Sequence, residues 1–332
     1  MAQLNHSGTT GATRENATHR SKTVLNTTAA SKSRRPYFAE KWAEFSLLLR
    51  LAVASPLLVV LGGATLPRVQ PAAPKAAPAA VSLYTLDGGL TEFQDAATFS
   101  DTGEYDGKPL ALPTPCYLIH HGNDWLLWDT GNGDQLAVLP QGKVKFGGRF
   151  SVRRTLGSQL TELGLTPADI RVVAVSHLHQ DHTGNLGLFP KATFLIDSTE
   201  LAWARGKPTP FGVEAAAIKP LDQARVKLLQ EDRDVFGDGS VRILKAPGHT
   251  PGSRMLLVKL AESGPVLVSG DLYHTRENYE QVLVPSVNTI RANTLASSQR
   301  FKRLVANTKA HVVIQHAPED FAAMPVFPKY LR

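Results

Sequence analysis

Ser176-His177-Leu178-His179-Gln180-Asp181-His182 places four side chains that can bind a metal within six residues, directly after a run of four apolar residues. In an extended segment alternate residues share a face, so His177, His179 and Asp181 can converge. His182 breaks the alternation and needs a turn to reach the same point. This spacing favours two metal ions over one. The alternative interpretation is a solvated polar loop that is rich in histidine.

Four further candidates follow predicted strands elsewhere in the chain. They are Asp129 in Leu-Leu-Trp-Asp-Thr-Gly, His249 in Ala-Pro-Gly-His-Thr-Pro-Gly, Asp271 in Val-Leu-Val-Ser-Gly-Asp, and His316 in Val-Val-Ile-Gln-His. Taken singly, each could be an ordinary turn or loop residue. Beside the 176–182 segment, however, His249 and His316 are expected to be metal ligands. Asp129 is expected to orient that segment without binding metal itself.

The net positive charge of the chain comes from its first 80 residues. The whole chain has a formal net charge of +7, with 36 Lys and Arg against 29 Asp and Glu. Residues 1–80 hold ten basic and three acidic residues, which leaves 26 of each in residues 81–332. A neutral body lacks the basic surface of a nucleic-acid-binding protein. No nucleic-acid partner is therefore expected.

The first 80 residues are interpreted as a leader and a linker. Residues 1–44 are polar and basic and are expected to be disordered. Residues 45–66 contain an apolar run from Leu51 to Thr65, which suits a signal peptide and is short for a membrane-spanning helix. Residues 67–80 form a Pro/Ala linker, and one folded domain is expected over residues 81–332.

The order of charge and hydropathy in the leader predicts where the folded domain is placed. Because basic residues precede the apolar run, the domain should be periplasmic or secreted, or attached to the membrane by residues 45–66. Two alternatives stay open. One is a start site upstream of the true one, and the other is a twin-arginine signal at Arg34-Arg35.

Short β-rich runs alternate with helical patterns in the rest of the chain. Strands are expected at residues 81–86, 116–120, 125–128, 171–175, 193–196, 241–244, 255–260, 266–269 and 311–315, and helices at residues 151–163, 198–204 and 294–307. This mixture predicts an α/β layered fold whose site lies on loops at strand ends. Residues 132–150, with exposed-looking Lys143, Phe146 and Phe150, are interpreted as an insertion near the pocket or at an interface.

The order of these motifs resembles the metallo-β-lactamase superfamily. Its pattern is a strand-end Asp-Thr-Gly, then His-x-His-x-Asp-His, then a downstream His, Asp and His, and all are present in residues 81–332. The resemblance implies an αββα four-layer sandwich with two zinc ions. It assigns His177, His179 and His249 to one ion, Asp181, His182 and His316 to the other, and Asp271 to both. Iron, manganese and cobalt are open alternatives to zinc.

Within this superfamily the chain looks most like the N-acyl homoserine lactonases. The supporting segments are residues 99–103, 176–185, 271–280 and 326–330. The absence of a Cys or Ser ligand, with Asp181 and His182 together, argues against the ligand sets of the β-lactamases. The resemblance implies a quorum-quenching lactonase that acts on a small-molecule substrate.

One departure from the lactonase pattern concerns catalysis. The family has a Tyr three residues after the bridging Asp, where this chain has His274, with Tyr273 one position earlier. The predicted mechanism is attack on the lactone carbonyl by a hydroxide held between the two ions. Asp181 is expected to pass a proton to the leaving oxygen, assisted by Tyr273 or His274.

The same metal centre would suit other substrates. Phosphotriesters, aryl esters, haloaromatics and thioesters are the rival substrate classes, and a metal-free binding protein is the alternative outside enzymes. Phe146, Phe150, Trp203 and Phe211 are candidates for an acyl channel, or else ordinary core or interface aromatics. A homodimer and membrane attachment through residues 45–66 are left open.

Overall fold

The computed structural model describes residues 80–332 of the chain. The predictions for residues 1–44 and 45–66, and those for the linker up to residue 79, lie outside this described part and stay predictions. Among residues 80–332, no helix is both long and apolar enough to cross a membrane.

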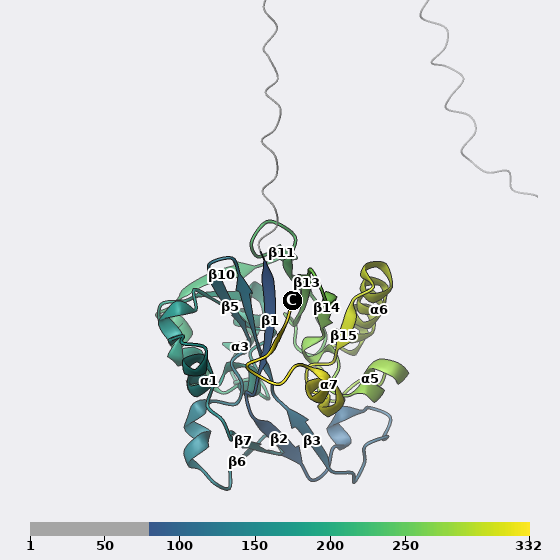
Figure 1. Cartoon of the computed structure of the whole chain (residues 1–332). Coiled ribbons are helices and arrows are strands. Elements are labelled where there is room, and N and C mark those ends of the chain that lie inside the picture. The colour runs from purple at the N-terminus through teal and green to yellow at the C-terminus, as the bar shows by residue number, and fades with distance from the viewer. Residues whose placement is uncertain (1–79) are drawn as a thin grey trace, which may run out of the picture. The chain divides into compact units, whose positions relative to one another are not determined.

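The larger of two facing sheets has seven strands in the order β10-β9-β8-β5-β4-β1-β16 (Figure 1). The strands are β1 Val81–Leu86, β4 Cys116–His121, β5 Asp124–Trp128, β8 Val172–Ala174, β9 Thr193–Asp197, β10 Arg225–Leu229 and β16 Tyr330–Leu331. Strand β8 runs parallel to β5 and to β9, so the carboxyl ends of these three strands meet at one edge of the sheet.

The second sheet has five strands in the order β11-β12-β13-β14-β15. They are β11 Arg233–Asp234, β12 Val241–Lys245, β13 Arg254–Leu260, β14 Gly264–Val268 and β15 His311–Val313. Only the pair β14 and β15 is parallel. Their carboxyl ends therefore also lie together.

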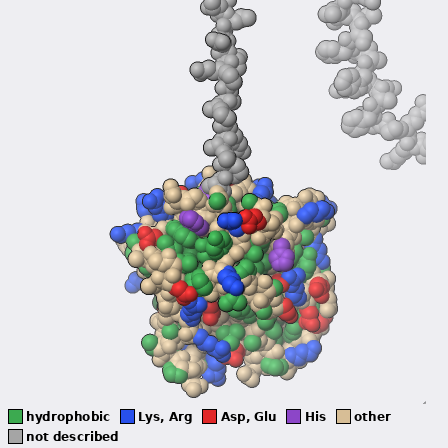
Figure 2. Space-filling view, viewed as in Figure 1, with side chains coloured by type: hydrophobic (Ala, Val, Ile, Leu, Met, Phe, Trp, Pro, Cys, Tyr) green, Lys and Arg blue, Asp and Glu red, His purple; other side chains and the backbone are tan. Residues whose placement is uncertain are grey.

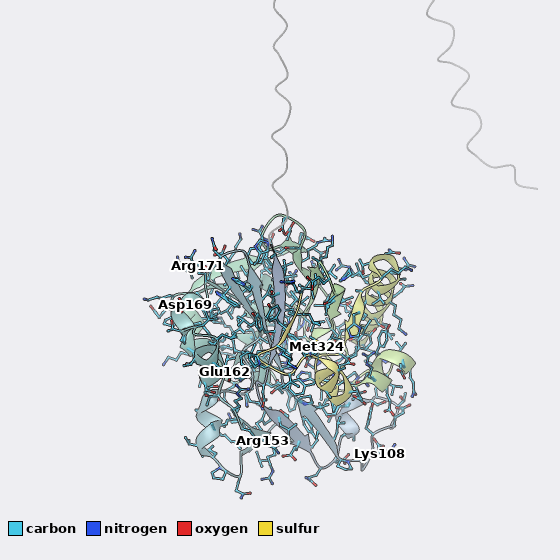
Figure 3. The ribbon with its side chains drawn as sticks, viewed as in Figure 1. Lys108, Arg153, Glu162, Asp169, Arg171 and Met324 are labelled. Atoms are coloured by element: carbon cyan, nitrogen blue, oxygen red, sulfur yellow. The ribbon has the colours of Figure 1, made fainter. Side chains whose placement is uncertain are left out.

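Both faces of the central strands of the large sheet are buried, and the alternation along β4 shows how. Cys116 and Leu118 pack in the cluster shared with α1 and α3, whereas Tyr117 and Ile119 pack against the second sheet. Alternate residues of a strand point to opposite faces, so the part of β4 that is covered on both sides, Cys116 to Ile119, is apolar. Met324, which is labelled in Figure 3, belongs to the core between the sheets.

Helices cover the outer faces of both sheets: α1, α3 and α4 pack on the large sheet, and α5 and α6 pack on the second. The described helices are α1 Leu156–Glu162, α2 Gln180–Thr183, α3 Ser198–Ala204, α4 Ala215–Ile218, α5 Arg276–Gln281, α6 Arg291–Thr308 and α7 Pro318–Ala323. A third cluster joins Phe301 of α6 to Leu257 and Leu267 of the second sheet. Three stacked cores thus separate four layers, and the predicted αββα sandwich is confirmed (Figure 1).

Charged residues of both signs cover the outer surface. Glu162, Asp169 and Arg171 project from the side of the large sheet that α1 covers (Figure 3). On the face in Figure 2, basic and acidic side chains are interspersed with apolar ones. This mixture agrees with the balanced charge of residues 81–332.

A third, four-stranded sheet corrects two of the sequence predictions. It has the order β3-β2-β7-β6, with β2 Leu90–Phe93, β3 Leu110–Pro113, β6 Lys143–Lys145 and β7 Gly148–Ser151. The expected helix at 151–163 starts later, because Ser151 pairs with Leu90 and Thr155 caps α1. The expected exposure of Phe150 is also wrong, since its side chain is buried.

Candidate metal centre

All the predicted ligands follow strands whose ends lie together. The 176–182 segment follows β8, His249 lies between β12 and β13, and Asp271 and His316 follow the parallel pair β14 and β15. A short helix, α2, begins directly after His179 and turns the chain so that His182 can face inward. The seven candidate ligands form two neighbouring groups, in which all ligand atoms lie within 4.8 Å of one another.

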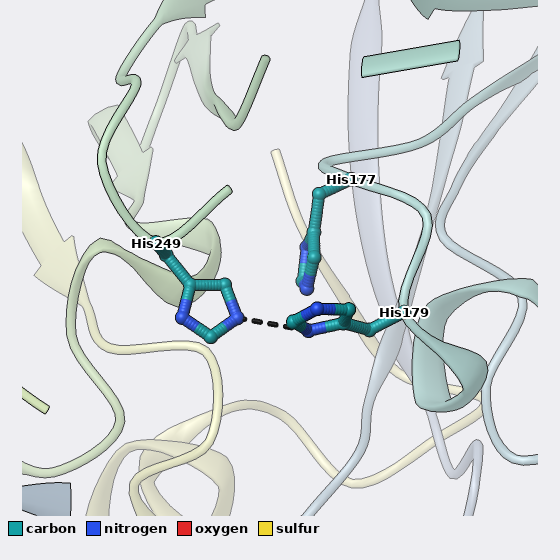
Figure 4. A group of neighbouring side chains, drawn as sticks. All are labelled: His177, His179 and His249. Carbon is teal, nitrogen blue, oxygen red and sulfur yellow. Dashed lines mark hydrogen bonds between the residues drawn. The ribbon is translucent and has the colours of Figure 1, made fainter. Parts of the chain in front are cut away.

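Three imidazoles make up the first group. His177, His179 and His249 point toward one another from two separate loops (Figure 4). His249 Nε2 lies 3.0 Å from His179 Nδ1. His177 Nε2 is fully buried and has no hydrogen-bond partner in the described part of the chain. Such an atom is costly unless something binds it, so this group fits a metal ion.

Asp271 joins the first group to the second, which consists of Asp181, His182 and His316. Its Oδ2 lies 3.7 Å from His177 Nε2 and 3.5 Å from His249 Nε2. Its Oδ1 lies 3.3 Å from His182 Nε2 and 3.0 Å from His316 Nε2. One oxygen therefore faces each group, which is the geometry that a bridging carboxylate needs.

In three of the five rings, a hydrogen bond on the far side decides which nitrogen faces the centre. His182 Nδ1 donates to Asp129 at 2.9 Å, and His249 Nδ1 donates to the Asn288 side-chain oxygen at 2.8 Å. His316 Nδ1 donates to the carbonyl of Pro113 at 2.7 Å. Each bond fixes a tautomer that leaves a lone pair on Nε2 for a metal.

Asp129 occupies the supporting position that the sequence suggested. One oxygen accepts the backbone N–H of Ser176 at 2.6 Å, and the other accepts from His182 and from Gln315 at 2.6 Å. Its backbone has a positive φ of 60°, which places it at a sharp turn after β5. The side chain thus orients the 176–182 segment from behind.

Burial and charge set the protonation of these rings. Burial lowers the pKa of His177 and His249 well below the usual range, and that of His179 to about 4. Neutral imidazole is the form that binds metal. Although burial acts against it, Asp271 raises the pKa of His182 and His316. A divalent cation at the centre would replace those protons as the partner of the carboxylate.

The structure separates the two candidates for the assisting group. His274 lines the pocket above the metal group, and its Nε2 lies 3.2 Å from Asp271. Tyr273 points the other way: its hydroxyl lies 2.6 Å from the Ser298 hydroxyl, inside the core beneath α6. The expectation that Tyr273 assists at the site is therefore wrong, because neighbouring residues of an extended segment face opposite sides.

An apolar pocket opens above the metal group. Phe146, Phe150 and Phe211 line it, together with Phe93, Phe99, Leu112 and Val287. Trp203 does not line it and packs instead against the core of the large sheet. Residues 132–150 were predicted to lie near the pocket or at an interface, and Phe146 and Phe150 of this segment do line the pocket.

Sequence reasoning missed the residues that support the ligands. Asn288, Gln315 and the Pro113 carbonyl come from three distant segments, and Glu200 contacts the backbone of two ligand loops. No sequence pattern marks any of them, because their role depends on contacts between segments far apart in the chain.

Comparison with known proteins agrees with the resemblance seen in the sequence. The family model described as Metallo-beta-lactamase superfamily matches residues 110–316. N-acyl homoserine lactonase AttM of Azorhizobium caulinodans is 32% identical over 263 residues, which are 75% of this chain and 98% of that protein. N-acyl homoserine lactonase AiiA of Bacillus thuringiensis subsp. kurstaki is 30% identical over 234 residues, covering 68% and 89%.

A solved structure shows the same fold. It is an N-acyl homoserine lactone hydrolase with the product N-hexanoyl-L-homoserine bound at the catalytic metal center. The TM-score is 0.66 at 26% identity, and the match covers 76% of this chain and 100% of that one.

Proposed function

Because the chain belongs to the metallo-β-lactamase superfamily, we propose that it is a zinc-dependent hydrolase that opens the lactone ring of N-acyl homoserine lactones. Relatives and a solved structure with that activity support the substrate class. The observation that carries the proposal is Asp271, whose two oxygens face two histidine groups at the base of an apolar pocket.

The ligand set fits two zinc ions, with His177, His179 and His249 holding one, Asp181, His182 and His316 holding the other, and Asp271 shared. When bound, two such ions supply a hydroxide nucleophile at neutral pH and polarise a carbonyl. The chain's own residues then orient the substrate and move protons.

Asp181 is placed to handle the proton of the ring opening. The Asp181 side chain lines the pocket and is 21% exposed, whereas that of Asp271 is only 4% exposed. Attack on the lactone carbonyl cleaves the bond to the ring oxygen, which leaves as an alcohol and must gain a proton. We assign that transfer to Asp181, with His274 donating a hydrogen bond from the opposite wall.

The pocket walls suit an acyl chain. Phe146 and Phe211 contact each other edge to face, with ring centroids 5.4 Å apart, and Phe150 lines the same pocket. Transfer of a hydrocarbon chain from water to such a wall is favourable, whereas a charged substituent would find few polar partners there.

The test is a substrate panel with the zinc-loaded full-length protein. A fall in pH should report rapid opening of acyl homoserine lactones, with slower turnover of a phosphotriester, an aryl ester, a chlorinated aromatic and a glutathione thioester. Asp271→Ala should lose zinc and activity together. Fast turnover of another class beside negligible lactone turnover would overturn the substrate. Fewer than about one ion per chain after zinc supplementation would indicate a metal-free binding protein.

A further inference from the structure

Glu200 is a buried carboxylate that the catalytic scheme does not use. It lies in the first turn of α3 and is 1% exposed. Its Oε1 accepts the backbone N–H of Leu178 at 2.9 Å, and its Oε2 accepts that of Gly252 at 2.9 Å. One side chain therefore joins two loops, at Leu178 and Gly252, that lie 74 positions apart in the sequence.

Both loops carry ligands of the three-imidazole group. Leu178 lies between His177 and His179, and Gly252 lies three residues after His249. Within the first group, the contact between the two loops is the pair His179 and His249 at 3.0 Å. Glu200 bonds the backbone of both loops, and it thereby limits how far the three rings can separate.

Gly252 shows how closely the second loop is pressed against α3. A Cβ atom at this position would lie 2.5 Å from Glu200 Cβ and 2.5 Å from the Glu200 backbone nitrogen. Real side-chain atoms do not come this close, so the approach requires glycine. The loop is therefore seated directly on the turn that carries Glu200.

The helix turn that carries Glu200 is itself anchored. Asp197 caps α3 by accepting the Thr199 N–H at 2.7 Å, and it also pairs with the buried guanidinium of Arg254. The backbone N–H of Arg254 donates to the Ser176 carbonyl at 2.8 Å. The helix turn that carries Glu200 is therefore held in place by hydrogen bonds to its neighbours.

Burying the Glu200 carboxylate costs free energy, but the two loops need a carboxylate to join them. Burial raises the pKa of Glu200 to about 7 despite hydrogen bonds from the Thr250 hydroxyl and from the two backbone N–H groups. Only a carboxylate can accept with both of its terminal atoms, because a glutamine would present an NH₂ group to one of the two donors. The two-loop contact therefore depends on a carboxylate at position 200.

We propose that Glu200 is a positioning residue for the metal ion held by His177, His179 and His249, because it sets the spacing of the two loops that supply them. The inference deepens the proposed function and rests on its metal centre, but not on the identity of the substrate. Supporting hydrogen bonds around a metal site are typically worth about 10–100-fold in metal affinity.

The test measures zinc affinity in the full-length protein by competition with a chromophoric chelator, next to thermal unfolding without metal. Glu200→Gln should weaken one of the two zinc sites by about 10–100-fold. Glu200→Asp keeps the charge but shortens the reach, and should give a smaller loss at the same site.

Asp234→Asn is the matched control, because Asp234 also accepts two backbone N–H groups, from Gly237 at 2.9 Å and Gly239 at 2.8 Å, but within one surface turn. It should leave both zinc affinities unchanged. Wild-type zinc affinity in Glu200→Gln, or an equal loss in Asp234→Asn, would overturn the proposal. If Glu200→Gln does not fold, Glu200→Asp decides by the same measurement, and wild-type affinity in it would overturn the proposal.

Failure of the proposed function would be seen separately, because wild-type protein with full zinc would then not open the lactones.

Discussion

His274 is the residue at which this chain departs from the lactonase pattern, and its position can be tested against its neighbour. His274→Ala should reduce kcat for lactone opening by about 100-fold, since a positioned proton donor contributes on this order. Tyr273→Phe should leave kcat unchanged, because its hydroxyl bonds Ser298 in the core. It should lower the free energy of unfolding by about 1 kcal/mol through the lost hydrogen bond.

Zinc content distinguishes a proton donor from a ligand at this position. His274 Nε2 lies within reach of Asp271 and His249 and forms a third cluster with them. If His274 assists the leaving group, the His274→Ala protein keeps both ions. A loss of one ion in proportion to the loss of activity would make His274 a ligand instead.

Asp238 gives a pH-dependent contribution to stability away from the site. Burial would raise its pKa, but hydrogen bonds from Ser240 and His121 outweigh burial and hold the pKa below the ordinary 3.8. A lowered folded-state pKa stabilises the fold fully above about pH 4, and the contribution is lost as the pH falls further. Asp238→Asn should therefore destabilise the protein more at pH 7 than at pH 3.

Urea unfolding at the two pH values measures this difference. Asp106→Asn is the control, since the Asp106 side chain is exposed and accepts no hydrogen bond in the described part of the chain. Equal destabilisation by Asp238→Asn at both pH values would contradict the assignment.

At the scale of elements, the hairpin of β6 and β7 should set the preference for acyl chains. Phe146 sits at its turn and lines the pocket, whereas Val144 of β6 is 68% exposed and does not. Phe146→Ala should lower kcat/KM about tenfold for a decanoyl homoserine lactone and less than twofold for a butanoyl one, because only the long chain reaches the lost apolar surface. Val144→Ala should change neither value, and an equal loss for both chain lengths would exclude this role.

Buried strands could be predicted from the sequence, whereas the short strands of the third sheet could not. Strands such as β1 and β13 were predictable because they are almost fully buried and most of their residues are apolar. The four short strands β2, β3, β6 and β7 were missed or read as an insertion. Each is partly exposed and has three or four residues, so its pairing depends on partners far away in the chain.

At the scale of the whole molecule, metal should stabilise the fold, since its candidate ligands come from both sheets. Removal of zinc by a chelator should lower the melting temperature, and added zinc should restore it. A ligand at 1,000 times its Kd stabilises the folded state by about 4 kcal/mol. Asp271→Asn should lose most of this response because Asp271 faces both groups. A melting temperature that does not respond to zinc in the wild-type protein would contradict a metal centre built across the two sheets.

The sequence by itself determined the superfamily, the layered fold and the candidate ligands, because metal-binding residue types must follow particular strands in a particular order. Only the tertiary structure decided which side chains face the centre. His274 faces Asp271, whereas Tyr273 points into the core. Trp203 packs on the core of the large sheet and does not line the pocket. Glu200 bonds the backbone of both ligand loops. These outcomes depend on the direction of a side chain and on contacts between distant segments. Local sequence carries neither, since both arise only when the two sheets pack together.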